Sequence, residues 1–393
     1  MNGSKSPRSP VASLVRDLPR SGIRDFFDIV STRKDVISLS IGEPDFATPW
    51  HIREASIYAL DHGATSYTSN RGLLKLRKGV SGYVDQEFGV RYDPETEILI
   101  TVGVSEALDL AVRALAEPGD EFIYHEPCYV SYRPVIALTH AVPVAVNTAR
   151  EQDFRLTAGM VEPHITPRTK ALILNFPTNP TGATLTRADV EGLARCALKH
   201  DLVVIADEIY SELTYEGDRG SIASIPGMKE RTIFLHGFSK AWAMTGFRVG
   251  YACGPADMIE AMMKIHQYTM LCAPILSQEA AVEALSQTAD TAEMRAAYEK
   301  RRNFVHASLN EMGLPCHLPR GAFYAFPWVG EFGLKSRDFA LRLLDEENVA
   351  CVPGTAFGEC GEGFLRCSYA TDLEQIKEAM TRMARFVARL AAR

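Results

Sequence analysis

Between residues 97 and 253, apolar residues gather in short continuous runs that are separated by stretches with helical spacing. Short apolar runs bounded by turn residues are typical of strands that are buried on both faces. Strands that alternate with helices predict a mostly parallel sheet with crossover helices. The strand-like runs are EILITVG, DEFIYHEPCY, AVPVAV, KALILNFPTNPTG, DLVVIADEIY, RTIFLHGFSK and VGYACG.

Other patterns flank and connect these runs. In the connection SEALDLAVRAL we expect Ser105 to cap the helix, because a serine side chain can accept a hydrogen bond from the first amides. Residues 35–46 predict a short strand that runs into a rigid turn at Gly42. Three further strand-like runs, GAFYAFPWV, VACVPGTAFG and GFLRCSYA, follow residue 303. The remaining helical stretches cover residues 11–33, 50–62, 73–88, 185–200 and 372–392.

These patterns predict an α/β chain in two parts. The alternating strands and helices are expected to form a large domain over residues 51–290. The segments on either side, residues 1–50 and 291–393, are expected to pack together as a smaller α+β domain. A chain of 393 residues is long enough to form both.

Composition narrows the class of protein. A net charge of −7 argues against nucleic acid or an anionic membrane as a partner. The eight cysteines are widely spaced, without a Cys-x-x-Cys pair or a partnering histidine cluster, which favours free thiols over disulfides or a metal site. No apolar run reaches spanning length, and residues 1–10 resemble a mobile tail rather than a signal peptide or an anchor. We therefore expect a cytoplasmic protein.

Candidate chemistry centres on the stretch HGFSKAWAMTGFRVGY, residues 236–251. Lys240 lies in a short turn beside Ser239, and Arg248 follows eight residues later. A lysine becomes a nucleophile when burial or neighbouring cations lower its pKa. An arginine nearby can hold the phosphate of the same molecule that the amine attacks. By itself, such a pair is more often two surface side chains, and only the other candidate residues favour the chemical interpretation.

Two strand ends add to this picture. In TVGVSEAL, residues 103–105 (Gly103, Val104 and Ser105) stand where a strand meets a helix, and free amides at such a junction attract phosphate. In LVVIADEIY, Asp207 and Tyr210 follow a strand, at the edge where α/β folds bind ligands. If the ligand is a pyridine, a carboxylate near its nitrogen keeps that nitrogen protonated. The alternative for the aspartate is an ordinary helix cap.

Three more residues are candidates for ligand contacts. Asn179, in NFPTNPTG, is held between prolines in a turn that can contain a cis bond, and its amide can donate to an anionic oxygen. Arg366 lies in an apolar strand-like run, so it needs either a ligand carboxylate or an internal acid. Tyr129 either stacks on a flat ring or fills the core.

Taken together, several stretches resemble the class I/II aminotransferases, the pyridoxal-phosphate (PLP) enzymes of fold type I. The resemblance runs from about residue 21 to the C-terminus. Similarity is closest to the aromatic amino acid and N-acetyl-diaminopimelate aminotransferases. The stretches are SLSIGEPDFATP, SYTSNRGLLKLR, NPTG, ADEIYSEL, GFSKAWAMTGFRVGY and VPGTAFGECGEGFLRCSYA.

The resemblance implies a role for each candidate. Lys240 forms a Schiff base with the cofactor and later moves a proton during transamination. Asp207 pairs with the pyridine nitrogen, and the enzyme is a homodimer in which the other subunit's Tyr67 joins the phosphate site. The other implied contacts are Gly103, Val104, Ser105, Ser239 and Arg248 with the phosphate, Tyr210 and Asn179 with the phenolic oxygen, Tyr129 with the ring face, and Arg366, Asn179 and the Gly42 backbone with the substrate carboxylate.

Departures from the family pattern bear on the substrate. Dicarboxylate-specific relatives place an arginine near the position of Gln267, and another aspartate-using subgroup has a lysine at the position of Ser105. Gly237 replaces a hydroxyl residue that often contacts the phosphate. The first two differences weaken a strict preference for aspartate and favour tyrosine, phenylalanine or a long acylated side chain, and the third leaves that phosphate contact to the backbone or to Ser239. We expect transfer from an L-amino acid, most simply an aromatic one, to 2-oxoglutarate.

Other functions stay open at this point. The alternatives are an aspartate or N-acetyl-diaminopimelate aminotransferase, or a cysteine-conjugate β-lyase on the same fold. A PLP-sensing regulator is disfavoured because the N-terminal extension is too short for a DNA-binding domain, and a dinucleotide oxidoreductase because no Gly-x-Gly-x-x-Gly follows a strand.

Overall fold

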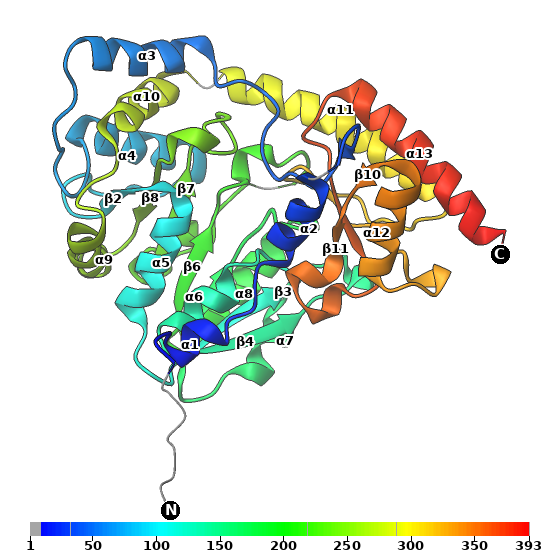
Figure 1. Cartoon of the computed structure of the whole chain (residues 1–393). Coiled ribbons are helices and arrows are strands. Elements are labelled where there is room, and N and C mark those ends of the chain that lie inside the picture. Colours follow the sequence, from blue (N-terminus) through cyan, green and yellow to red (C-terminus); the bar gives the residue numbers. More distant parts are fainter. Residues whose placement is uncertain (1–8, 32, 218, 288, 393) are drawn as a thin grey trace, which may run out of the picture.

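A seven-stranded sheet forms the centre of the computed structural model, which describes residues 9–31, 33–217, 219–287 and 289–392 (Figure 1). The strand order is β2-β8-β7-β6-β5-β3-β4, and only β8 runs antiparallel to its neighbours. The expected mostly parallel sheet is therefore confirmed. Its strands are β2 (Ile98–Thr101), β3 (Glu121–Glu126), β4 (Val142–Asn147), β5 (Thr169–Leu174), β6 (Val203–Asp207), β7 (Thr232–Gly237) and β8 (Gly250–Cys253).

Helices cover both faces of this sheet because successive strand residues point to opposite sides. Ile205 packs in the same buried cluster as residues of α5 and α9, whereas its neighbour Val204 packs with residues of α8. Burial on both faces explains why the strands read as continuous apolar runs. The helices of this part are α3 (Trp50–Asp61), α4 (Leu74–Phe88), α5 (Gly103–Leu115), α6 (Tyr132–Leu138), α7 (Ala158–Val161), α8 (Arg187–Lys199), α9 (Ala256–Thr269) and α10 (Ile275–Ser286).

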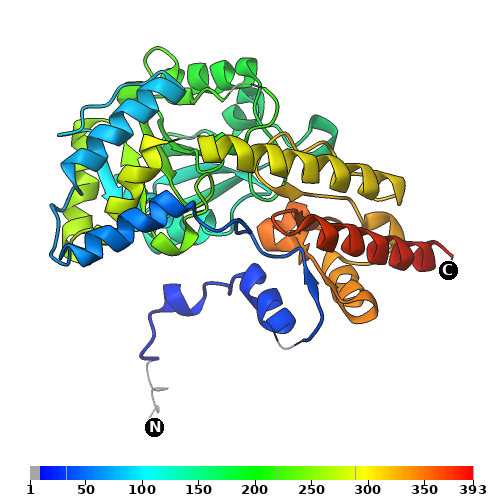
Figure 2. The same cartoon turned by 90° about the horizontal axis from the view of Figure 1, so that it is seen from above.

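A smaller unit combines the first and last parts of the described chain. Phe26 and Leu39 share one buried core with Tyr369 and Phe386, and α11 lies beside α13 (Figure 2). Its strands are β1 (Ile37–Ser38), paired with β10 (Val349–Ala350), and β11 (Val352–Pro353), β12 (Leu365–Ser368) and β9 (Tyr324–Ala325) in a second small sheet. Its helices are α1 (Ser13–Arg16), α2 (Gly22–Ser31), α11 (Ala289–Glu311), α12 (Ser336–Glu347) and α13 (Leu373–Ala391).

Two local predictions are wrong. The helical spacing over residues 11–33 corresponds to two short helices, α1 and α2, because Pro19 disfavours helical backbone at the residue before it. Ser105 does not cap α5: that helix begins at Gly103, with Val102 in the cap position and no side-chain cap. The predicted domain boundaries stay a prediction, and the expected tail falls outside the described residues except for residues 9 and 10.

Candidate active site

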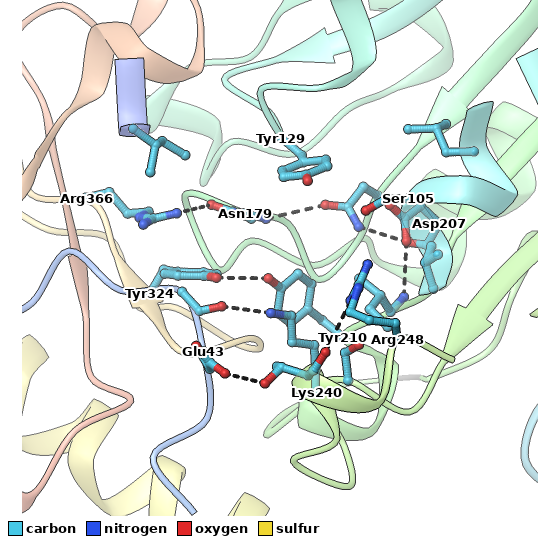
Figure 3. Close-up of a pocket in the computed structure, with 18 residues that line it drawn as sticks. Glu43, Ser105, Tyr129, Asn179, Asp207, Tyr210, Lys240, Arg248, Tyr324 and Arg366 are labelled. Carbon is cyan, nitrogen blue, oxygen red and sulfur yellow. Dashed lines mark hydrogen bonds between the residues drawn. The ribbon is translucent and has the colours of Figure 1, made fainter. Parts of the chain in front are cut away.

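A cavity of about 410 Å³ opens where the carboxyl ends of β6 and β7 face the start of α5 (Figure 3). In α/β sheets this edge is where ligands bind. The smaller unit closes the other side through residues of β9, β12 and the segment after β1. The sequence-predicted residues that line the cavity are Gly42, Val104, Ser105, Tyr129, Asn179, Asp207, Tyr210, Ser239, Lys240, Arg248 and Arg366.

Lys240 lies in the turn that follows β7, and its amine points into the cavity. The Nζ atom donates a hydrogen bond to the backbone oxygen of Gly42 at 2.7 Å. Burial lowers the pKa of Lys240 to about 8; the nearby cations Arg366 and Arg248 also lower it, and Glu43 opposes them. The neutral, nucleophilic amine is therefore accessible near neutral pH.

Asp207 ends β6 and is 5% exposed. Its Oδ2 atom accepts a hydrogen bond from the hydroxyl of Tyr132 at 2.7 Å, and its Oδ1 atom accepts one from the amide of Ile209 at 3.3 Å. The side chain of Asn175 donates to the backbone oxygen of Asp207 at 2.9 Å. Burial raises the pKa of Asp207 to about 6 in spite of these donors. A buried acid of this kind is suited to share a proton with a basic atom in the cavity.

The start of α5 is a candidate anion site. Gly103 has a φ of +76°, which favours glycine, and a Cβ atom there would lie 2.7 Å from Nη2 of Arg248 and displace the guanidinium. Val104 and Ser105 follow in the first turn, where helix amides lack partners within the helix. Arg248 is fixed by a hydrogen bond from Nη1 to the Thr245 backbone oxygen at 3.3 Å. Amides, helix dipole and guanidinium together favour a phosphate.

Arg366 lies on β12 and is 2% exposed. Its Nη1 atom donates to Oδ1 of Asn179 at 3.0 Å, and its Nη2 atom donates to the backbone oxygen of Ser40 at 2.6 Å. The guanidinium carbon lies 4.6 Å from the centre of the Tyr324 ring and 4.8 Å from that of Phe357. Within the described chain it has no carboxylate partner, and its Nε atom has no acceptor. The internal ion pair considered from the sequence is thus not formed, and the cation remains available to a ligand anion.

Aromatic side chains form the walls of the cavity. The hydroxyl groups of Tyr210 and Tyr324 are hydrogen-bonded at 2.9 Å, and Nζ of Lys240 lies 6.0 Å from the centre of the Tyr210 ring. Tyr129 lines the opposite wall, edge-on to Tyr132 at 5.8 Å between ring centres (Figure 3). The space between these walls suits a flat ring.

Two of the predicted site residues, Tyr67 and Gly103, do not line the cavity. Tyr67 does not line the cavity and is 83% exposed. Gly103 lies behind the cavity wall, against Arg248.

At Gly237 a Cβ atom would lie 2.9 Å from Cα of Gly250, so a hydroxyl-bearing side chain has no room there. Ser239, which lines the cavity, is the hydroxyl residue next to Lys240. The bond between Asn179 and Pro180 is cis, as the turn sequence allowed.

Several functional candidates were missed in the sequence. Asn175 follows β5 at the same sheet edge as Asp207, so its position after a strand was a usable signal. Tyr132 follows Tyr129 by three residues, which gave no indication of its contact with Asp207. Tyr324 and Glu43 reach the cavity from the smaller unit, through contacts that no local pattern encodes.

The described chain also holds one group of potential metal ligands. Donor atoms of Glu162, Cys196 and His200 lie within 4.8 Å of one another. The ammonium of Lys199 already pairs with Glu162 at 3.1 Å, and we assign no metal to this group. All eight cysteines are free thiols, as the sequence favoured. Among the described helices, none combines the length and apolar character that crossing a membrane requires.

Comparison with known proteins places this site in a family. Residues 34–383 match the model of the aminotransferases of class I and II. The chain is 44% identical to aromatic-amino-acid aminotransferase 2 of Thermococcus litoralis, over 92% of this chain and 94% of that protein. It is 45% identical to the aspartate aminotransferase of Pyrococcus abyssi, over the same shares.

A solved structure gives the same result for the fold. The aspartate aminotransferase from Thermus thermophilus with maleate superposes with a TM-score of 0.92 at 36% identity, covering 96% of this chain and all of that one. The fold neighbours and the family match agree with the cavity chemistry. The chain therefore belongs to the class I and II aminotransferases, transaminases of fold type I that use pyridoxal phosphate.

Proposed function

We propose that this protein transfers the amino group of an aromatic L-amino acid to 2-oxoglutarate, with Lys240 as the amine that bonds to the PLP aldehyde. One observation carries the proposal. A lysine with a pKa lowered to about 8 faces a cavity that also holds a buried acid, Asp207, and the guanidinium of Arg366, which has no carboxylate partner among the described residues. An amine, an acid and an anion site in one cavity are what PLP and an amino acid require together.

The donor set fits each part of the cofactor. The first turn of α5 and Arg248 suit the phosphate, since Gly103 leaves the space that brings them together. Asp207 suits the pyridine nitrogen, and Tyr129 suits the ring face. Tyr210 and Asn179 carry the donors for the phenolic oxygen. When bound, PLP supplies an aldehyde and a ring that accepts electrons.

We assign a separate role in the reaction to each of three residues, Lys240, Asp207 and Arg366. Lys240 attacks as a neutral amine and, once released, moves a proton to or from the substrate Cα atom. Asp207 holds a proton on the ring nitrogen, and Tyr132 keeps that carboxylate in position at 2.7 Å. Arg366, steadied by Asn179, grips the substrate carboxylate with two parallel donors and orients the Cα–H bond.

The charges of the cavity support an aromatic donor. Among the described lining residues the cationic side chains are Lys240, Arg248 and Arg366, and the proposed roles use all three. Gln267 does not line the cavity of the single chain, and its amide carries no positive charge. The wall toward the N-terminal segment includes the apolar side chain of Ile23. The choice of 2-oxoglutarate as acceptor rests on the family resemblance.

We also propose a cytoplasmic homodimer in which the partner subunit's Tyr67 completes the phosphate site. Tyr67 is exposed in the single chain, and large apolar side chains are exposed near it in sequence and at the end of α9, among them Trp50, Tyr58 and Tyr268. Large exposed apolar side chains of this kind favour contact with a second chain. A C₂ dimer would place each tyrosine at its neighbour's site.

A panel of amino donors tests the proposal. Purified protein loaded with PLP is mixed with tyrosine, phenylalanine, aspartate or cystathionine, and loss of the visible absorption band reports amino-group uptake. We expect aromatic donors to react fastest, and 2-oxoglutarate to restore the band. Faster reaction with aspartate, or release of pyruvate and ammonia from cystathionine without an acceptor, would instead favour the alternatives. Sustained turnover by Lys240→Ala would contradict the role given to that lysine.

A further inference from the structure

A buried polar group lies behind the turn that carries Lys240. It consists of Tyr83 on α4, Glu212 in the 3₁₀ turn Ser211–Leu213, and His236 on β7, and we call it the Glu212 cluster. The hydroxyl of Tyr83 donates to Oε1 of Glu212, and Nε2 of His236 lies 2.9 Å from Oε2. His236 is fully buried, Glu212 is 4% exposed and Tyr83 is 8% exposed. None of the three lines the cavity.

A buried carboxylate costs free energy unless it is well paired, so the partners of Glu212 determine its state. Burial raises the pKa of Glu212, but His236 and the hydrogen bonds outweigh it, so the pKa lies below its usual value and the group stays ionised. Within the described chain Nδ1 of His236 has no hydrogen-bond partner. Glu212 is therefore the side chain that fixes the orientation of the imidazole.

The Glu212 cluster joins the two turns that carry the cavity chemistry. Glu212 follows Tyr210 by two residues, and the amide of Leu213 closes back on the Tyr210 oxygen at 2.9 Å. His236 precedes Lys240 by four residues on β7. A break in the bond between Glu212 and His236 would let these two turns move relative to each other.

A third contact ties the far side of the lysine turn to the same cluster. The ring of Trp242, two residues after Lys240, lies 5.5 Å from that of Tyr83 and 6.4 Å from that of His236. The amide of Trp242 also donates to the Phe238 oxygen at 3.3 Å, which closes the turn around the lysine. Both ends of the turn thus contact side chains of the Glu212 cluster.

We propose that Glu212 and His236 are positioning residues, which set the distance of the Lys240 amine from Tyr210 and Asp207 without touching substrate or cofactor. This inference rests on the proposed function of Lys240. None of the three side chains lines the cavity, so the cluster would act through the positions of the two turns that it joins. Misplacement of a reacting group by about 1 Å can cost up to about a hundredfold in rate.

The test compares Glu212→Gln with Glu121→Gln as a matched control. Glu121 is also a buried carboxylate, 5% exposed, which accepts from Thr166 at 2.6 Å and Arg168 at 2.9 Å, but it lies at the opposite end of the sheet. Each holoenzyme is titrated with pH while its visible absorption, which reports the protonation of the bond to Lys240, is recorded. Thermal stability, kcat and KM are measured alongside.

For Glu212→Gln we expect the midpoint of the spectral titration to move by at least about half a pH unit, since one unit equals about 1.4 kcal/mol at that bond. We expect kcat to fall by about tenfold. KM for the amino acid should stay unchanged, because the contacts of Arg366 do not involve the cluster. Glu121→Gln should lose stability and keep the wild-type midpoint.

A second variant protects the test against misfolding. Tyr83→Phe removes one hydrogen bond to Glu212 and keeps the ring, and it should move the midpoint in the same direction by a smaller amount. If both variants lose stability and keep the midpoint of Glu121→Gln, the cluster is only structural and the inference is overturned. If wild-type protein and Lys240→Ala give the same spectrum with PLP, the proposed function fails, and the inference fails with it.

Discussion

At the scale of single residues, the cavity combines groups whose pKa values move toward each other. Lys240 falls to about 8 and Asp207 rises to about 6, and burial is the main cause in both cases. An amine and an acid that titrate on either side of neutral pH can exchange protons with a ligand at little cost. Arg366 is the complementary case, a buried cation without a carboxylate partner among the described residues, for which we propose that the ligand supplies the anion.

The raised pKa of Asp207 predicts a measurable destabilisation of the cofactor-free protein. The folded state holds this proton up to about pH 6, whereas an ordinary aspartate releases it near 3.8. The stabilisation by the protonated carboxyl is therefore complete below about pH 4 and lost as the pH rises through about 6. Two pKa units correspond to about 3 kcal/mol. Without PLP, Asp207→Asn should thus gain stability over wild type across this window.

Urea unfolding of the two cofactor-free proteins at a series of pH values checks this. The difference between their midpoints should grow from about pH 4 to about pH 6 and then level off. With PLP bound, the order should reverse, because the asparagine cannot hold the ring nitrogen's proton. A midpoint difference that is constant with pH would contradict the assigned cause.

At the scale of elements, the junction between β2 and α5 depends on a single glycine. Gly103 has positive φ and stands where a Cβ atom would meet the guanidinium of Arg248 at 2.7 Å. Gly103→Ala should strain this turn and push the arginine away from the helix start. We expect the affinity for PLP to fall by at least about tenfold, or about 1.4 kcal/mol.

Thr186→Ala serves as the control for this prediction. Thr186 caps α8, where its side chain and that of Asp189 form a capping box far from the cavity. Its loss should cost about 1 kcal/mol of stability and leave PLP affinity unchanged. Titration of the two cofactor-free variants with PLP, followed by absorbance, measures the PLP affinity of each. Equal affinities for the two variants would show that the glycine is not required for the anion site.

The comparison between sequence and structure is clearest at this scale. Asp207 and Lys240 could be predicted because strand ends at one sheet edge meet in space, and apolar runs reveal where strands end. The contact of Tyr324 with Arg366 could not, since it depends on how the smaller unit docks against the sheet. The prediction that Ser105 caps α5 was wrong because it relied on the capping preference of serine alone. The helix already begins at Gly103, two residues before Ser105.

At the scale of the whole molecule, the cavity lies between two units and is proposed to need a second chain. This predicts complementation between two inactive variants. Tyr67→Ala lacks the residue that the partner would receive, and Lys240→Ala lacks the amine. In a mixed dimer one site has both residues intact, whereas the other has neither.

Mixing the two variants under conditions that exchange subunits should therefore restore activity. Random pairing makes half of the dimers mixed, so about a quarter of all sites recover. Each variant on its own, and the two mixed without exchange, should show none of this gain. If the mixture never exceeds the sum of the separate variants, Tyr67 acts within its own chain or not at all.

The pairing of β1 with β10 has a consequence for biosynthesis. Ile37 pairs with Val349, which is made 312 residues later. A ribosome that adds about 5–20 residues per second needs roughly 15 to 60 s to cover that interval. The central sheet leaves the exit tunnel well before the smaller unit can assemble. We therefore expect the hydrogen bond between Lys240 and the Gly42 carbonyl, which follows β1, to form only when translation is nearly over. We therefore expect PLP to bind only after synthesis is nearly complete, and a nascent chain stalled before residue 349 should remain colourless.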